Sequence, residues 1–179
     1  MPAGAEPVTR VIGPAPGLLG DIVALHGRYY AQHWQFPFAF ESGVARAMAS
    51  FLDRYDPACD LVLSVRGTER WLGSITLDAS DPALRPGEAH LRWFILDPDL
   101  HGRGLGHRLL GEAIAFARTT GIRSVYLTTF RGLDRAFALY TAAGFRVVEE
   151  RLGRNWGAEV VELTLELTLR RDRPGEKRP

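Results

Sequence analysis

Hydrophobic and polar residues alternate near the C-terminal end of the chain. Over residues 158–169 every second position from Val161 onward is aliphatic, and Glu162, Thr164 and Glu166 lie between these positions. A period of two places successive side chains on opposite faces of a strand, so one face is apolar and the other polar. The pattern therefore predicts a strand with one face packed against the core.

A second pattern has the helical period of about 3.6 residues. Leucine, isoleucine and alanine recur at intervals of three and four over residues 105–117, and Gly121 ends the expected helix. The same two periods predict the other elements of the chain. Strands are expected over residues 7–12, 60–66, 71–78, 88–96, 123–129, 145–152 and 158–169, and helices from Pro16, over 42–55, from the glycine-rich segment 101–106 to Thr120, and over 133–143.

The expected elements follow the order β-α-α-β-β-β-α-β-α-β-β. Hairpins join some strands and helices join others, so the sheet is mixed. We expect an α/β (α+β) fold, with a mostly antiparallel sheet of six to seven strands and helices on both faces. Residues 1–170 are expected to form a single domain, and the charged tail, residues 171–179, is predicted to be disordered.

Composition and charge narrow the possible partners. The chain has 179 residues, 46% of them hydrophobic, and this is enough for one well-formed core. A formal net charge of +1 gives no field that would favour nucleic acid or an anionic membrane. We see no membrane span and no secretion signal, and the single Cys59 suits a reducing compartment. We therefore expect a cytoplasmic protein, and no spacing of His, Cys, Asp and Glu indicates a metal site.

The segment HGRGLG, residues 101–106, lies between an expected strand and an expected helix. Glycines permit a tight turn that directs main-chain N–H groups inward, and the helix dipole adds positive charge, so such a junction can bind an anion. A plain strand–helix connection is the alternative. Two other phosphate loops fail on spacing, because the Walker A loop needs Gly-Lys-Ser/Thr and the dinucleotide fingerprint needs glycine where His107 and Leu109 stand.

Two segments resemble the GNAT superfamily of N-acetyltransferases. LDPDLHGRGLGHRLL, residues 96–110, resembles motif A of that family, and AFALYTAAGF, residues 136–145, resembles its Ala-x-x-Leu-Tyr-x-x-x-Gly-Phe segment. They occur in the order and at the separation that the family shows. Residues 91–94 and 155–157 are further similar to the acetyltransferase domains fused to MarR-type regulators.

The resemblance implies acetyl-CoA as co-substrate. It implies that the main chain of the glycine-rich turn holds the coenzyme A pyrophosphate, and that the preceding strand splays from the next one to pair with pantetheine. A main-chain N–H near Leu96 would polarise the thioester carbonyl. The residues implied in coenzyme binding are Phe94, Ile95, Leu96, His101, Gly102, Arg103, Gly104, Leu105, Gly106 and His107. His101 departs from the family pattern, which usually has Gln or Arg at this position.

Acyl transfer to an amine needs a proton donor for the leaving thiolate and a proton acceptor for the amine. Tyr140 matches the general acid of the family, and the alternative is a core aromatic. Two positions where relatives carry a catalytic glutamate hold His90 and Thr128. His90 can act as a base, with Glu88 two residues away on the same strand face to orient it. The alternative is a surface histidine and a water chain that removes the proton.

An aromatic segment, residues 29–38, lies where family members line the acceptor pocket. Tyr30, Trp34 and Phe38 are the candidate walls there, with Thr128 as a further acceptor residue. Aromatic walls suit an apolar or cationic acceptor, although the same residues could form core. The function predicted is transfer of an acetyl group to a primary amine of a small molecule, with a protein or peptide amine, or a non-catalytic acyl-CoA-binding module, as alternatives. A homodimer is a further expectation.

Overall fold

We describe residues 7–169 of a computed structural model, so the predicted disorder of residues 171–179 lies outside the described range. Within these residues, seven strands and four α-helices follow one another in the order expected from the sequence, with one added 3-10 turn. The elements are β1 (Thr9–Ile12), α1 (Leu18–Trp34), α2 (Phe38–Asp53), β2 (Leu61–Arg66), β3 (Trp71–Asp78), β4 (Glu88–Leu96), η1 (Pro98–Leu100), α3 (Leu105–Thr119), β5 (Ser124–Phe130), α4 (Asp134–Ala142), β6 (Arg146–Gly153) and β7 (Val160–Thr168).

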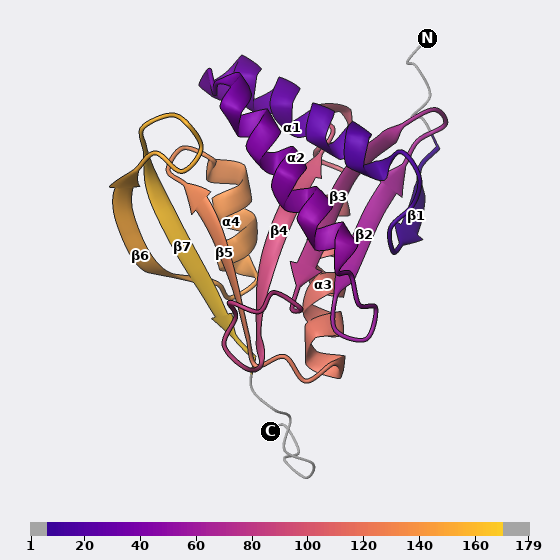
Figure 1. The fold of residues 1–179 in the computed structure, drawn as a ribbon, viewed down its shortest axis with the longest axis vertical. Coiled ribbons are helices and arrows are strands. Elements are labelled where there is room, and N and C mark those ends of the chain that lie inside the picture. Colours follow the sequence, from indigo (N-terminus) through magenta and orange to yellow (C-terminus); the bar gives the residue numbers. More distant parts are fainter. Residues whose placement is uncertain (1–6, 170–179) are drawn as a thin grey trace.

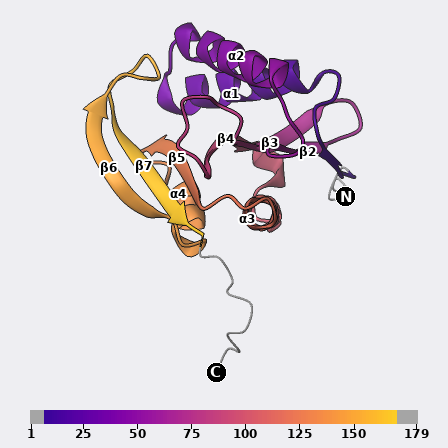
Figure 2. The ribbon, with the colours of Figure 1, turned by 60° about the horizontal axis from the view of Figure 1, so that its bottom comes forward.

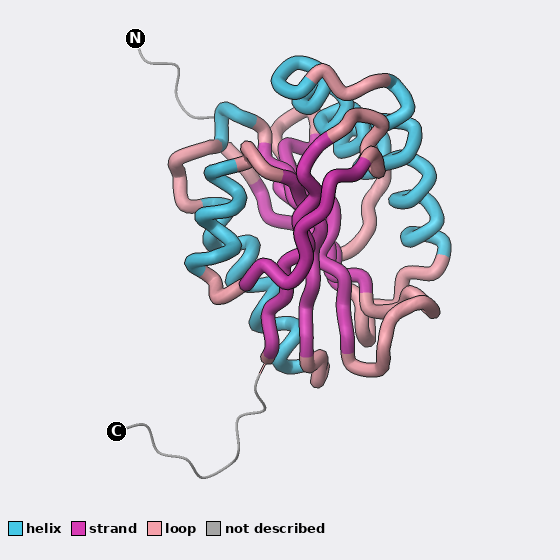
Figure 3. Tube along the Cα trace, turned by 90° about the vertical axis from the view of Figure 1, so that its left-hand side faces the viewer, coloured by secondary structure: helices cyan, strands magenta, loops and turns pink. Residues whose placement is uncertain are grey.

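The strands form one sheet in the order β1-β2-β3-β4-β5-β7-β6. Every neighbouring pair is antiparallel except β4 and β5, which are parallel. Helices α1 and α2 lie on one face, and α3 and α4 lie on the other (Figures 2 and 3). The predicted mixed, mostly antiparallel sheet with helices on both faces is therefore confirmed.

The two halves of the sheet differ in how helices cover them. Helices α1 and α2 lie over β2, β3 and β4, whereas β7 and β6 are uncovered on that face (Figure 1). All residues of β6 except Gly153 are exposed, while β3 is buried throughout. We call β1–β4 the covered half and β5, β7 and β6 the open half.

The hydrophobic pattern of the sequence accounts for the core on both faces. Leucines and alanines of α3 pack with apolar residues of β2–β5 and β7, and the predicted alternation in β7 is confirmed because its leucines join this cluster. Residues of α1 and α2 pack on the other face against side chains of β2, β3 and β4. Burial of these two faces removes apolar surface from water and fixes the sheet between its helices.

The prediction for the start of α2 was wrong by one turn. The helix begins at Phe38 rather than Ser42, because extended Pro37 serves as its N-cap residue and the helix starts directly after it. Helix α1 ends three residues before this proline, at Trp34, and Gln35 then turns the chain with a left-handed φ of 55°. The aromatic segment therefore forms the end of α1, a tight turn and the start of α2.

A β-bulge interrupts β4 at Trp93. Trp93 has a φ of 46°, and the register with β3 shifts there, since Ser74 pairs with Ile95 while Thr76 pairs with Arg92. An extra residue in one strand reverses the direction of the side chains that follow it. Leu91 accordingly packs on the α3 face, and Trp93 and Ile95 pack on the α1 face.

The strands β4 and β5 separate after a short paired stretch. Their register contains three pairs, of which the last joins His90 to Tyr126. Beyond this point the two strands diverge, and the opening widens toward the C-terminal end of each strand (Figure 1). The main chain of β4 from Leu91 onward thus has no partner on its β5 side among the described strands.

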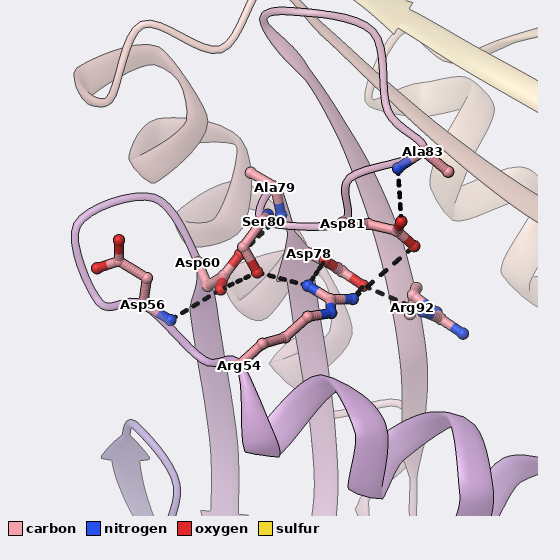
Figure 4. A network of polar contacts seen from close by, with 9 residues as sticks. All are labelled: Arg54, Asp56, Asp60, Asp78, Ala79, Ser80, Asp81, Ala83 and Arg92. Atoms are coloured by element: carbon pink, nitrogen blue, oxygen red, sulfur yellow. Dashed lines mark hydrogen bonds and ion pairs between the residues drawn. The ribbon is translucent and has the colours of Figure 1, made fainter.

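A network of buried carboxylates ties the end of α2 to the covered half (Figure 4). Asp78 is fully buried and accepts hydrogen bonds from the guanidinium groups of Arg54 and Arg92. Asp60, also buried, accepts from the main-chain N–H groups of Ala79 and Ser80 at 2.7 and 3.0 Å. Burial alone would raise the pKa of Asp78, but the hydrogen bonds from the two arginines outweigh it and hold that pKa below its ordinary value.

Candidate active site

Three elements meet at the opening between β4 and β5. Beyond the bulge, Phe94 and Leu96 join the core on the α3 side. The ring of Phe94 lies 6.2 Å from that of Tyr140 on α4. A Cβ built on Gly106 would lie 3.5 Å from Leu139 and 3.8 Å from Phe94. The glycine-rich turn, the end of β4 and the helix that carries Tyr140 are therefore in contact, as the family resemblance implies.

The N-terminus of α3 offers unpaired main-chain donors. Gly104 is its N-cap residue, with a left-handed φ of 73°, and no side chain caps the helix. Gly102 is also left-handed, at 76°, and a Cβ at either glycine would meet no atom within 4 Å. Backbone angle rather than crowding thus explains these glycines. The free N–H groups of the first turn and the helix dipole give the turn the chemistry of a phosphate site.

The exposed His101 lies at the edge of this turn. Its Nε2 is 3.1 Å from the main-chain oxygen of Leu96, so the ring donates a hydrogen bond to the end of β4. Arg103 and His107 are also exposed, and Leu105 is half-buried. The side chain of His101 thus holds the turn to β4, which differs from the phosphate contact usual at this position in the family.

Two tyrosines approach the opening from opposite faces of the sheet. Tyr140 belongs to α4 and is buried, and Tyr30 belongs to α1. Burial raises the pKa of the Tyr140 phenol above its ordinary value, and Tyr30 raises it further by charge repulsion. No hydrogen bond within residues 7–169 occupies the Tyr140 hydroxyl. Tyr140 therefore stays protonated at neutral pH, as a proton donor must.

His90 lies where the two strands begin to separate. Its ring stacks on Tyr126 with centroids 4.2 Å apart, and burial followed by the nearby Arg92 charge lowers the pKa of His90 to about 4. Glu88 instead accepts a hydrogen bond from Arg85 at 2.6 Å, and none of the described hydrogen bonds joins Glu88 to His90. His90 is thus neutral at pH 7, but its lowered pKa makes it a weaker base than an ordinary histidine, and Glu88 is not its hydrogen-bond partner.

The predicted acceptor residues are partly core. Tyr30 packs against Phe36, Phe40 and Phe130, with ring centroids 4.9 to 6.0 Å apart. Trp34 packs edge-on against Phe130 at 4.8 Å, and a Cβ on Gly132 would collide with its ring. Phe38 is 79% exposed and belongs to no described cluster, so it is not brought to the others. The aromatic segment is therefore mostly a packed wall beside β5.

Thr128 lies apart from this wall, in a polar cavity of about 90 Å³ on the open half. The sequence did not single out most of this cavity, and in particular not Glu162, which is 6% exposed. The alternation of β7 does place Glu162, Thr164 and Glu166 on one polar face, which was the signal available. The lining residues are Thr128, Glu149, Arg151, Asn155, Trp156, Glu162, Leu163 and Thr164.

Three further findings concern His26, metal binding and membrane spans. His26 is buried, and its Nδ1 lies 2.8 Å from the main-chain oxygen of Ile22. Residues 7–169 contain no group of three or more His, Cys, Asp or Glu side chains that could hold a metal ion. In the same range, every helix is too short or too polar to cross a membrane.

Comparison with known proteins supports the family resemblance. A family model described as "Acetyltransferase (GNAT) family" matches residues 23–145. N-alpha-acetyltransferase RimI of Mycobacterium tuberculosis is 39% identical over 89 residues, which are 49% of this chain and 51% of RimI. An uncharacterized protein of Mycobacterium leprae is 40% identical over 68 residues, 38% of this chain and 17% of that protein. The chain thus aligns with about half of RimI and with less of the second relative.

Solved structures share the fold at low sequence identity. An acetyltransferase of the GNAT family from Staphylococcus aureus Mu50 superposes with a TM-score of 0.70 at 14% identity, over 92% of this chain and all of the other. The ribosomal-protein-S18-alanine N-acetyltransferase of Escherichia coli superposes with a TM-score of 0.65 at 17% identity, over 94% of this chain and 99% of that one. At such identities the likeness establishes the fold, not the acceptor.

Proposed function

Because the chain belongs to the acetyltransferase (GNAT) family, we propose that it transfers an acetyl group from acetyl-CoA to a primary amine of a small molecule. The observation that carries the proposal is the opening between β4 and β5, bordered by the uncapped N-terminus of α3 and by Tyr140. Acetyl-CoA is the co-substrate of this family. A site with main-chain donors at one end and a buried phenol beside it suits a long acyl thioester with a pyrophosphate.

In this proposal the coenzyme contacts are made mostly by the main chain. The N–H groups at Gly102–His107 hold the pyrophosphate, and the unpaired edge of β4 at Phe94, Ile95 and Leu96 binds pantetheine in the manner of a neighbouring strand. An N–H near Leu96 donates a hydrogen bond to the thioester oxygen, where negative charge develops. One such preorganised donor contributes about 3–4 kcal/mol in other acyl-transfer sites.

Direct transfer then requires two proton movements. The amine nitrogen attacks the thioester carbon, the carbon–sulfur bond breaks, and the thiolate takes the proton of the Tyr140 hydroxyl. The nitrogen loses its own proton to His90 or to a water chain. Burial raises the pKa of Tyr140, so the phenol holds its proton until the thiolate forms and then recovers a proton from solvent.

The acceptor is expected on the open half, beside the polar cavity that includes Thr128. A volume of about 90 Å³ accommodates a few heavy atoms. Among its lining residues Glu162 and Arg151 form an ion pair, and Glu149 adds a further negative charge, so the cavity has a net negative charge. These properties favour a compact cationic amine. The similarity to RimI favours a second candidate, the α-amine of a protein or peptide.

A panel of amines tests the proposal directly. Release of thiol from acetyl-CoA is measured with amino acids, polyamines, aminoglycosides and alanine-initiated peptides. Turnover of a small amine supports the first candidate, and turnover of peptides alone supports the second. Acetyl-CoA binding without turnover of any amine would leave a non-catalytic acyl-CoA-binding module. The cytoplasmic location, the homodimer and the likeness to MarR-fused domains stay predictions.

Replacement of Tyr140 by Phe tests the general acid. We expect kcat to fall by about 100-fold, because a positioned proton donor typically contributes 10²–10⁴. The Kd of acetyl-CoA, measured by calorimetry, should change little since the ring still packs against Phe94. Phe137→Leu, on the exposed side of the same helix, is the control. A wild-type kcat for Tyr140→Phe would remove the phenol from the mechanism.

A further inference from the structure

The loop between β6 and β7, residues 154–159, is hydrogen-bonded to one buried carboxylate, that of Glu162 on β7. Glu162 accepts a hydrogen bond from the main-chain N–H of Asn155 at 2.8 Å and another from its side-chain amide at 2.7 Å. Arg151 on β6 adds an ion pair at 3.0 Å. One side chain of β7 therefore bonds both to the loop and to the neighbouring strand.

Gly153 on β6 leaves room for this carboxylate because it has no side chain. A Cβ on Gly153 would lie between 2.3 and 2.5 Å from the carboxylate atoms of Glu162, so any side chain there would require this carboxylate to move. Burying an ionised carboxylate is unfavourable unless it is hydrogen-bonded and paired. The ion pair comes from Arg151 on β6, but both hydrogen bonds come from Asn155, so the burial of Glu162 is coupled to the position of the loop.

The loop in turn contacts the helices across the open half. The ring of Trp156 lies 5.3 Å from that of Phe130 on β5. Gly157 approaches the turn between α1 and α2, since a Cβ on this residue would lie 2.8 Å from Pro37. The loop thus spans from the β6–β7 edge to the α1–α2 turn and closes one side of the polar cavity, to which Asn155 and Trp156 contribute.

We propose that Glu162 is a positioning residue that sets the shape of the acceptor site by holding the β6–β7 loop. The inference rests on the proposed function, because it takes this cavity as the place where the amine is received. Glu162 does not touch the reacting atoms. It acts through Asn155 and Trp156, so its loss affects binding of the amine more than binding of acetyl-CoA, whose proposed site is the opening between β4 and β5.

The test replaces Glu162 by Gln, which keeps the size of the side chain and removes its charge. Three donors, the main-chain N–H and side-chain amide of Asn155 and the guanidinium of Arg151, then face an amide instead of a carboxylate. We expect the KM for the amine to rise roughly tenfold, the size of effect that follows loss of a charged hydrogen bond. The Kd of acetyl-CoA is expected to stay at the wild-type value.

A structural readout that does not depend on activity accompanies the kinetics. Arg154 is an exposed residue of the loop and a trypsin site. Limited proteolysis followed by mass spectrometry should show faster cleavage after Arg154 in Glu162→Gln than in the wild type. If no amine is turned over by the wild type, the proposed function fails, and the proteolysis still reports whether Glu162 holds the loop.

Two further variants guard against a simple loss of folding. Asn155→Ala changes an exposed loop residue and should reproduce both effects in a folded protein. Glu150→Gln is the matched control. Glu150 also lies on β6 and also pairs with an arginine, Arg131, which follows β5. Its side chain is 43% exposed, however, and it lies opposite Leu163 in the register. Unchanged amine KM in both Glu162→Gln and Asn155→Ala, or an equal rise in Glu150→Gln, would overturn the proposal.

Discussion

Asp78 and Glu162 are both buried carboxylates paired with arginine, yet they lie in different halves of the sheet. Asp78 belongs to the covered half and binds Arg54 and Arg92, which come from a helix end and a neighbouring strand. Glu162 belongs to the open half and binds Arg151 together with a loop. The first carboxylate joins regular elements to one another, and the second joins a strand to an irregular segment.

A buried carboxylate paired with arginine can therefore have two different roles, depending on whether its partners belong to regular elements or to a loop. In the covered half, Asp78 is fully buried, so loss of its ion pairs should appear as lost stability. In the open half, the outer partner Arg151 is exposed and the loop can leave without unfolding the sheet. Loss of the second carboxylate should appear as altered acceptor binding. Three experiments test this difference.

The largest effect is expected for Asp78→Asn. It removes the charged partner of the partly buried Arg92 and the nearer of the two carboxylates paired with Arg54. Breaking such a buried pair costs about 3–5 kcal/mol of unfolding free energy. Urea denaturation followed by circular dichroism measures this change. Asp81→Asn is the control, because Asp81 lies 3.8 Å from the same Arg54 but is 34% exposed on its side chain.

The amine KM of folded Asp78→Asn is expected to stay close to the wild-type value, in contrast to Glu162→Gln. A loss of stability in Asp78→Asn no larger than in Asp81→Asn would show that burial does not separate the two halves. An amine KM that rises as far as in Glu162→Gln would contradict the division of roles itself.

A pH effect of intermediate size should arise in the covered half from His26. Burial lowers the pKa of His26 from 6.5 to about 4, against a raising effect of its bond to Ile22. Between these two pH values the unfolded chain binds the proton and the folded chain does not, so stability falls as pH decreases from about 6.5 to about 4. The shift corresponds to about 3 kcal/mol at its full extent.

His26→Gln should flatten this pH dependence without abolishing it. His90 has a similarly lowered pKa and contributes a second slope of the same sign. Thermal unfolding between pH 7 and pH 5 measures the difference, with the exposed His107→Gln as the comparison. If His26→Gln kept the full wild-type slope, burial of His26 would not be the source of the acid sensitivity.

The sequence predicted the elements of both halves better than the contacts between distant residues, and the physical reason is locality. The order of elements and the apolar faces follow from periods of two and 3.6 residues, which neighbouring residues carry. The glycine-rich turn and Tyr140 were found because both lie in short contiguous motifs. Their predicted roles in coenzyme binding and proton transfer stay predictions.

What the sequence could not predict depends on contacts between distant residues. The burial of Glu162 depends on the loop and Gly153 beside it, whereas alternation alone assigned Glu162 only to the polar face of the strand. The partners of Asp78 come from positions 54 and 92 and share no spacing rule. The exposure of Phe38 follows from the start of α2, which Pro37 sets four residues earlier than expected.

The smallest effect is expected at the boundary between the halves, where Ser74 supports the bulge in β4. Its buried hydroxyl donates a hydrogen bond of 2.7 Å to the main-chain oxygen of Trp93, whose left-handed φ is unfavourable for a bulky residue. Ser74→Ala leaves that oxygen unpaired and should cost about 1–2 kcal/mol of unfolding free energy. Because the bulge directs the unpaired edge of β4, the affinity for acetyl-CoA should fall as well, while amine KM does not.

The matched control for Ser74→Ala lies two residues away on the same strand face. Thr76 is buried, and its hydroxyl has no hydrogen-bond partner within the described residues. Thr76→Val replaces this unsatisfied hydroxyl by a methyl group of similar size. We expect Thr76→Val to leave stability unchanged or to raise it, and to leave the calorimetric Kd of acetyl-CoA unaltered. Equal behaviour of the two variants would mean that the bulge holds without Ser74. A fall in acetyl-CoA affinity in Ser74→Ala alone would mean that the covered half determines coenzyme binding at the unpaired edge of β4, whereas the open half determines binding of the amine.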